Sequence, residues 1–385
     1  MNANLLARLI ALASLISSAI GAAASEPTVP LGGQGNSIEP KVASVMKQAG
    51  SALNGKEYDL AISRLTAALR MKPNANTASA IYAWRADAYI HKGELSKAMD
   101  DANEAIRLNP HSYDAYLQRG IVYRRTGNLD KAISDFDTVI RLNPSSSLGY
   151  QGRAVVYNYK GDYQRSIRES TEAIRRNPRD ARLYVNRAFD YESIGNFDKA
   201  IADYTKAIGL DTADIAAYSR RAYLYVQFGN LNQASADYDR AIRCIPRDAY
   251  GYMFRAKAYF AKGNYKGAAS DFAKTAQLSS NDDKVLDSLA RFKATCPDSS
   301  FRNGKEALEV ATKACELTKW KDPSYLDSLA AAYAETGDFD QAIKYQGQAL
   351  NIKSVHPFWR QEMQERLELY RRHQPYREES KFRKG

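Results

Sequence analysis

The chain contains few residues whose types and spacing would support catalysis or ligand binding. Residues 50–56 fit G-x-x-x-x-G-K, the pattern of a glycine-rich loop that holds nucleotide phosphates. Glu57 follows, however, where such a loop needs a Ser or Thr hydroxyl for Mg²⁺. The segment is also expected on a helix and the turn after it, whereas a phosphate loop follows a strand. The sequence therefore argues against a nucleotide site.

The four histidines and three cysteines are scattered and form no H-x-x-x-H or C-x-x-C pattern. We therefore expect no metal and no cofactor. Cys296 is expected at a turn and Cys315 near the far end of the next helix, about 16 Å along its axis, which is too far for a disulfide. We expect each cysteine, Cys244 included, to pack as a small apolar residue. No nucleophile–base pair or close acidic dyad stands out, so the sequence favours a protein that is not an enzyme.

A period of 34 residues dominates the sequence. Pro110, Pro144 and Pro178 are 34 residues apart, and Pro246 follows two periods later. Such a period indicates stacked pairs of helices. Units start near residues 42, 79, 113, 147, 181, 215 and 249, and the last six share Tyr at positions 4 and 11, a small residue at 8 and 20, and Gly at 15. The first unit is weaker, with Val45 and Ala52 at positions 4 and 11. The glycines at position 15 are Gly93, Gly127, Gly161, Gly195, Gly229 and Gly263.

These positions have mechanical roles. Positions 4, 8 and 11 share one face of the first helix, so the small residue lets the second helix approach while the tyrosines fill the space beside it. An aromatic cage for a ligand is the alternative use of these tyrosines. Gly at position 15 allows the positive φ of a helix–helix turn. The pattern resembles the tetratricopeptide repeat (TPR) family. That resemblance implies an all-α, right-handed superhelical solenoid of about nine helix-turn-helix units with a carboxyl-terminal capping helix.

The carboxyl-terminal third departs from the strict period and resembles the ends of many bacterial TPR arrays. We expect the capping helix to carry its apolar residues on one face, namely Phe358, Trp359, Met363, Leu367 and Tyr370. The tail after it is charged, and we expect it to fray. The expected organisation is seven units in 42–282, a degenerate eighth and a ninth unit in 283–356, the capping helix in 357–373 and the tail in 374–385.

Charged residues repeat with the same period. Position 7 is Arg and position 23 is Asp or Glu in six units, and these positions face each other in an antiparallel helix pair. We predict an Arg–carboxylate pair in each unit: Arg85–Asp101, Arg119–Asp135, Arg153–Glu169, Arg187–Asp203, Arg221–Asp237 and Arg255–Asp271. Such pairs set the register of the helices more than they add stability. The net charge of +11 therefore overstates any basic surface.

The family resemblance also implies where a partner would bind. In TPR proteins the first helices line a concave face, and positions 2, 5, 9 and 12 commonly point inward. Position 9 gives an apolar or aromatic run flanked by positive charge, which suits an extended or helical peptide. The alternative is that this run only fills a tight superhelix. The candidate partner-binding residues are Leu117, Ile121, Arg124, Val155, Asn158, Val185, Phe189, Tyr223, Met253, Lys257 and Phe260.

The amino terminus indicates export. Residues 1–24 have the apolar run and A-x-A site of a secretory signal, and residues 25–41 are rich in Pro, Gly and Ser, as in a flexible linker. We therefore expect a non-catalytic protein-interaction scaffold that is periplasmic or secreted, in a bacterial envelope assembly. An uncleaved signal anchor in the inner membrane remains the alternative location. The alternative functions are nucleic-acid binding, which the positive charge would serve, and a regulatory subunit of an enzyme.

Overall fold

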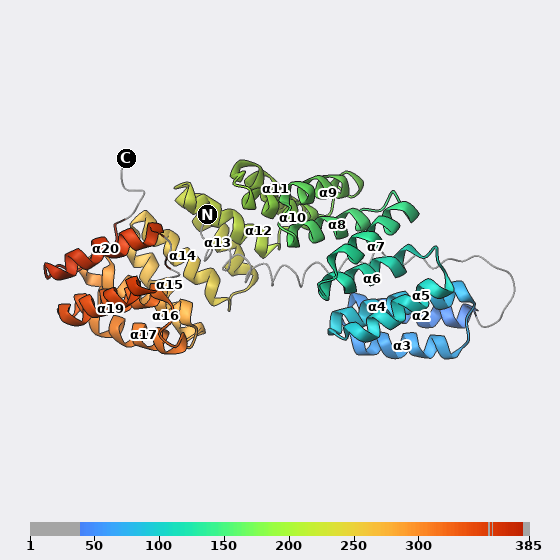
Figure 1. Cartoon of the computed structure of the whole chain (residues 1–385), viewed down its shortest axis with the longest axis horizontal. Helices are drawn as coiled ribbons and strands as arrows, with labels where there is room; N and C mark the ends of the chain where they lie inside the picture. The colour runs from blue at the N-terminus through green and yellow to red at the C-terminus, as the bar shows by residue number, and fades with distance from the viewer. Residues whose placement is uncertain (1–38, 353–354, 356, 380–385) are drawn as a thin grey trace. The chain divides into compact units, whose positions relative to one another are not determined.

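The computed structural model describes residues 39–352, 355 and 357–379. Its regular structure over these residues consists of nineteen α-helices and one short 3₁₀ turn (Figure 1). The helices form two compact units that divide between Asp211 and Thr212. The expected signal, and the expected linker up to residue 38, lie outside the described residues. The first helix, α2, begins at Glu39, inside the segment expected to be linker.

The amino-terminal unit is a row of antiparallel helix pairs, in which each helix packs against the next along the chain. Its second pair, α4 and α5, is closed by the turn at Gly93, and the later pairs repeat this form. The helices are α2 Glu39–Asn54, α3 Tyr58–Arg70, α4 Ala75–Lys92, α5 Leu95–Leu108, α6 Tyr113–Arg125, α7 Leu129–Leu142, α8 Leu148–Tyr159, α9 Tyr163–Arg176, α10 Ala181–Ser193 and α11 Phe197–Leu210.

The carboxyl-terminal unit continues with the same pairing. The turn between the two helices of the eighth repeat contains the 3₁₀ turn η1, Ser299–Phe301. The helices are α12 Ile215–Gln227, α13 Leu231–Cys244, α14 Ala249–Lys262, α15 Tyr265–Leu278, α16 Asp283–Thr295, α17 Gly304–Leu317, α18 Pro323–Glu335, α19 Phe339–Asn351 and α20 Pro357–Arg371.

Glycine at position 15 forms the turn within most of the pairs. Gly93 ends α4 with φ of 78°, and its amide donates to the Ile90 carbonyl. All six glycines predicted at this position have positive φ, and so does Gly337 in the ninth repeat. This left-handed backbone is free of strain only for a residue without Cβ. The first repeat has Lys56 there instead, with φ of 61°.

The six predicted Arg–carboxylate pairs all form. Arg187 places Nε and Nη2 each 2.8 Å from the Asp203 carboxylate, and the other five arginines bond the carboxylates of Asp101, Asp135, Glu169, Asp237 and Asp271. The guanidinium of Arg187 also lies between the rings of Tyr184 and Tyr191, 5.9 and 5.8 Å from their centres. The tyrosines at positions 4 and 11 therefore sandwich a structural cation.

The same arginines also reach the preceding repeat. Arg187 Nη1 lies 3.0 Å from Thr171 Oγ1 on α9. Four other arginines also bond a side chain of the preceding repeat, in the pairs Arg85–Thr66, Arg119–Asn103, Arg153–Asp137 and Arg255–Asp239. Each of these five guanidiniums thus joins three helices, because it bonds both its own second helix and the one before it.

One buried ring changes the packing of the third and fourth repeats. Phe136 on α7 is fully buried. A Cβ at Gly120 on α6 would lie 2.8 Å from this ring, and one at Gly152 on α8 would lie 2.6 Å from it. The two glycines therefore make room for the buried ring of Phe136.

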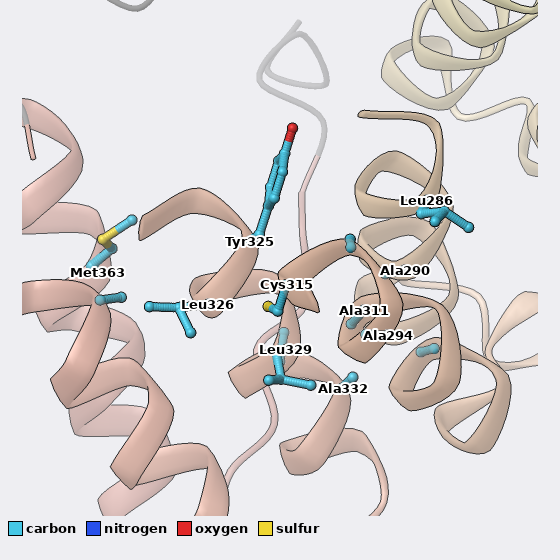
Figure 2. Close-up of a cluster of buried hydrophobic side chains, with 14 of the residues drawn as sticks. Leu286, Ala290, Ala294, Ala311, Cys315, Tyr325, Leu326, Leu329, Ala332 and Met363 are labelled. Atoms are coloured by element: carbon cyan, nitrogen blue, oxygen red, sulfur yellow. The ribbon is translucent and has the colours of Figure 1, made fainter. Parts of the chain in front are cut away.

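The core of the last repeats is shared by four α-helices and the capping helix. It combines small residues of α16 and α17, such as Ala290, Ala311 and Cys315, with larger ones of α18 and α20, such as Leu329 and Met363 (Figure 2). All of these side chains are at most 3% exposed. The small side chains allow the helices to approach closely, so the degenerate eighth repeat still packs as a TPR-like pair.

The capping helix differs in part from the prediction. Met363 and Tyr370 are buried and Leu367 is partly buried, as expected, but Trp359 is 38% exposed. The side chain of Phe358 lies outside the described residues. Arg366 shares the buried face, with its Nε 2.9 Å from Asp327 on α18. The buried face therefore includes an ion pair that the apolar pattern did not predict.

The tail also differs from the prediction over the residues that the structure describes. Instead of fraying, residues 375–379 turn back onto the ends of α16 and α18. The Glu378 amide donates to the Thr295 carbonyl at 2.9 Å, and Arg377 pairs with Glu335 at 2.6 Å. A charged composition did not reveal that these charges have partners on the array.

Candidate functional site

The structure carries the candidate groove residues of the amino-terminal unit on three first helices. Leu117, Ile121 and Arg124 lie on α6, Val155 and Asn158 on α8, and Val185 and Phe189 on α10. α8 packs against both α6 and α10, so the three helices lie side by side. The residues at position 5, together with Val155, are buried, whereas Ile121, Asn158 and Phe189 remain partly exposed.

The four candidate residues of the carboxyl-terminal unit fall on α12 and α14. Tyr223 on α12 is partly exposed, and Lys257 on α14 is exposed. Met253 is 3% exposed and belongs to the core. Phe260 packs its ring 5.5 Å from Tyr265 and 6.0 Å from Phe292, measured between ring centres. Met253 and Phe260 are therefore structural in large part, and the accessible groups of this set are Tyr223 and Lys257.

Arg124 is not a free cation at the edge of the groove. It is 8% exposed, and its guanidinium lies 5.6 Å from the ring centre of Tyr159, which is itself 57% exposed. Burial lowers the pKa of Arg124. Over the described residues no carboxylate pairs with it, so Tyr159 covers a charge that is only partly compensated.

A buried polar cluster lies behind the groove residues of α8 and α10. Asp190 on α10 is 1% exposed. Its Oδ1 accepts from Asn158 Nδ2 at 2.6 Å, and its Oδ2 lies 2.5 Å from the Ser166 hydroxyl. The same hydroxyl lies 2.8 Å from the Ala154 carbonyl oxygen. Sequence reasoning did not select Asp190 or Ser166.

One hydroxyl hydrogen cannot serve both acceptors of Ser166, the Ala154 carbonyl and the Asp190 carboxylate. When Asp190 carries a proton, Ser166 can donate to Ala154 and accept from Asp190; when Asp190 is ionised, Ser166 and Asn158 both donate to it. Burial raises the pKa of Asp190 to about 7, although these hydrogen bonds to the ionised form oppose the shift. The carboxyl group is thus held in its neutral form up to about neutral pH.

The repeat pattern contained a signal for this cluster. Asp190 is at position 10, where other repeats have Ala88, Val122, Val156, Leu224 and Ala258. Ser166 is at position 20, where the other units have alanine. A comparison of each position across repeats would have found both departures.

Two further carboxylates lie at the amino-terminal end of the groove. Asp87 on α4 is at position 9, and its Oδ1 lies 3.8 Å from His91 Nε2. Burial raises the pKa of Asp87 to about 6, although His91 and Arg125 oppose the shift. Burial and the charge of Asp87 together raise the pKa of Asp114 to about 6. The apolar run of Ile121 and Phe189 therefore begins beside an acidic pair.

The residues considered for other chemistry are placed as follows. Residues 50–56 span the end of α2 and the following turn, as predicted. All three cysteines are free, and Cys296 and Cys315 are buried, which raises the pKa of both thiols. Cys244 is exposed, contrary to the prediction, because it is the last residue of α13. Within the described ranges no group of His, Cys, Asp and Glu is arranged to hold a metal ion.

None of the helices that the structure describes has the length and apolar character needed to cross a membrane.

Comparison with known proteins identifies the repeat. Family models described as tetratricopeptide repeat match residues 46–112, 113–146, 181–214, 219–283 and 323–356, which together cover more than half of the chain. Among curated proteins, the SGT1 homolog of Oryza sativa subsp. japonica is 36% identical over 73 residues, which are 19% of this chain and 19% of that protein. The chain thus spans about a fifth of the length of this relative.

Solved structures show the same helical repeats at low sequence identity. A tetratricopeptide repeat protein from Parabacteroides merdae is 20% identical, with a TM-score of 0.45 over 65% of this chain and 97% of that one. PilF of Pseudomonas aeruginosa is 15% identical, with a TM-score of 0.49 over 54% and 95%. With its 34-residue period, its paired helices and the family matches along its length, the chain belongs to the tetratricopeptide repeat family.

Proposed function

We propose that this protein is a non-catalytic scaffold that binds a peptide segment of a partner protein on the inner face of its first helices. Tetratricopeptide repeats serve as protein-interaction scaffolds, and the present proposal assigns the contact surface. The observation that carries it is the partial exposure of Ile121 on α6 and Phe189 on α10, the two first helices on either side of α8, whose other groove residues are buried. Apolar side chains left accessible on a rigid, otherwise packed face are typical of binding sites.

The charges beside this face indicate which end of a bound segment is basic. Asp87 and Asp114 lie at the amino-terminal end of the apolar run. Arg124 is covered by Tyr159, so it offers little attraction to an acidic ligand. We therefore propose an extended or helical segment with apolar side chains for Ile121 and Phe189, and a basic residue for the acidic pair.

The positive net charge gives little support to nucleic-acid binding. Six arginines are committed to carboxylates within the repeats. These arginines are unavailable for phosphate contacts. A steep salt dependence of binding to single strands would be the sign of the alternative function.

Export belongs to the same proposal. The apolar amino-terminal segment and its A-x-A site support a periplasmic or secreted protein in a bacterial envelope assembly. Cell fractionation and the mass of the purified protein test this point. A mature chain that starts near Ser25 in the exported fraction supports it, and a full-length chain in the cytoplasm contradicts it.

The binding site is tested with the full chain and an aromatic control. Partners are first captured by crosslinking in cells and identified by mass spectrometry. The change Phe189→Ala, alone and with Tyr223→Ala, should then weaken binding of the identified partner about tenfold or more, as central aromatic contacts commonly do. Phe228→Ala removes an aromatic that is 49% exposed at the turn after α12, and it should leave binding unchanged. Helix content by circular dichroism should be the same in all variants. Equal affinity of the Phe189 and Phe228 variants would exclude this face.

A further inference from the structure

The tail after α20 makes a set of specific contacts that the proposed partner site does not use. Residues 375–379 are named here the strap. The strap amide at Glu378 donates to the carbonyl of Thr295, the last residue of α16. Arg377 donates to the carbonyl of Ala294 at 3.2 Å and pairs with Glu335, the last residue of α18, at 2.6 Å. The strap therefore bridges the carboxyl-terminal ends of two first helices.

The strap contacts a repeat position that belongs to the candidate groove further upstream. Ala294 is at position 12 of the eighth repeat, and Thr295 and Glu335 are at position 13 of the eighth and ninth repeats. In the upstream repeats, position 12 holds Arg124 and Asn158, which belong to the candidate groove. Ala294 and Thr295 are fully buried, and the strap contacts both of them through their carbonyl oxygens.

The charges of the strap match those of its seat. Asp327 on α18 is 1% exposed and accepts from Arg291 at 2.6 Å and from Arg366 at 2.9 Å. Two cations on one carboxylate leave a positive excess, and Glu378 lies 3.9 Å from Arg291. The carboxylate of Glu335, in turn, faces the cation of Arg377. A basic residue followed by an acidic one is therefore the order that this seat accepts.

An aromatic side chain holds the near end of the strap. Tyr376 packs against the buried cluster of Ala330, Ala334 and Tyr370, and the guanidinium of Arg366 lies 5.1 Å from its ring centre. The strap thus combines one aromatic anchor, two main-chain acceptors on a helix end and two complementary charges. These are the elements by which proteins recognise short extended peptides.

From these contacts we propose that the ends of α16 and α18 form a second peptide-binding site, and that the chain's own strap occupies it. The site selects an extended segment in the order aromatic, basic, acidic, as in Tyr376, Arg377 and Glu378. In the resting protein the strap closes the inner face of the last two repeats to other segments. This site is separate from the one proposed on α6, α8 and α10 and stands whether or not that one binds a partner.

The first test measures whether the site accepts the segment from outside. A fluorescent peptide of residues 374–385 is titrated into three full-length chains: the natural one, the double variant Tyr376→Ala/Arg377→Ala, and Glu379→Ala. Glu379 is exposed and lies at the end of the strap, so its variant is the matched control. The double variant should bind the peptide at least about tenfold more tightly than the other two chains. A peptide that carries the same two substitutions should bind to none of them.

Each other outcome overturns the proposal. If no chain binds the peptide, the ends of α16 and α18 are not a peptide site. If all chains bind it equally, the strap does not close the site. Circular dichroism must show the same helix content in the three chains, because the substitutions lie outside the helices.

A second measurement uses the natural chain alone. Hydrogen exchange of the Glu378 amide should be slowed at least about tenfold relative to the free peptide, since this amide is bonded to Thr295. Raising the salt concentration should speed this exchange in the natural chain, because its charge pairs are partly exposed. Exchange as fast as in the free peptide at low salt would show that the strap is not seated.

Discussion

The change Asp190→Asn should make the amino-terminal unit more stable above neutral pH. An asparagine can copy the protonated carboxyl group, because its oxygen accepts from Asn158 while its amide donates to Ser166, which still donates to Ala154. It cannot ionise, however. The substitution therefore keeps the hydrogen bonds of the cluster and removes the cost of a buried charge.

The size of the effect follows from the pKa of Asp190. That pKa is about 7 in the folded protein, against 3.8 for an ordinary Asp. Between these pH values the unfolded chain has lost the proton and the folded chain still holds it, so the free energy of unfolding falls as the pH rises. At about 1.4 kcal/mol for each pH unit, Asp190 lowers the free energy of unfolding by up to about 4 kcal/mol above pH 7. The advantage of the asparagine variant should grow from pH 4 to pH 7 and then stay constant.

Urea unfolding of the full chain between pH 4 and pH 8, with hydrogen exchange in α10, measures this difference. Asp198→Asn is the matched control, because Asp198 is exposed on the next helix. Asp87 and Asp114 also titrate near pH 6, but they are present in both chains and cancel in the comparison. If the asparagine variant and the natural chain are equally stable at pH 4 and at pH 8, Asp190 does not carry a proton in the folded state and the hydrogen-bond argument is wrong.

Two further changes test the packing of the repeats. Arg187→Met should leave the fold nearly intact, because a methionine fills the space between the tyrosines and the carboxylate of Asp203, 7% exposed, can bind water. Circular dichroism measures this outcome. Complete unfolding would show that the pair does more than set the register of the helices. Gly152→Ala should lower the free energy of unfolding by about 1–3 kcal/mol, since its Cβ would overlap the Phe136 ring. Phe136→Leu in the same chain should recover part of that loss in urea unfolding, and a fully stable Gly152→Ala chain would contradict the close contact.

Much of the fold follows from periodicity, because a repeated position has the same neighbours each time. Arg187 and Asp203 could be paired from spacing alone, and the turn at Gly93 needs only the backbone freedom of glycine. The same logic breaks down where a residue departs from its repeat. Asp190 bonds Ser166, which stands where the other units have alanine, as well as Asn158. The strap contacts charges that lie more than forty residues away along the chain, at Glu335 and Arg291.

The candidate groove was predictable only as a line of positions. The family resemblance implied inward-facing positions for Ile121, Phe189 and Met253, but it could not say which of them the neighbouring helix would cover. Met253 is 3% exposed, whereas Phe189 keeps part of its surface open. Which side chains remain accessible depends on the local approach of adjacent helices, and that distance is set by glycines and rings such as Gly152 and Phe136.

Arginines that bond both the second helix of their own repeat and the helix before it affect how repeats can be added to the array or removed from it. Within either compact unit, a repeat brings an arginine, the carboxylate sixteen residues after it, and a polar acceptor for the arginine that follows, as Thr171 does for Arg187. Duplicating or deleting one block of 34 residues therefore leaves every cation matched. A chain of this design can gain or lose a module in one genetic step without stranding a charge in its interior.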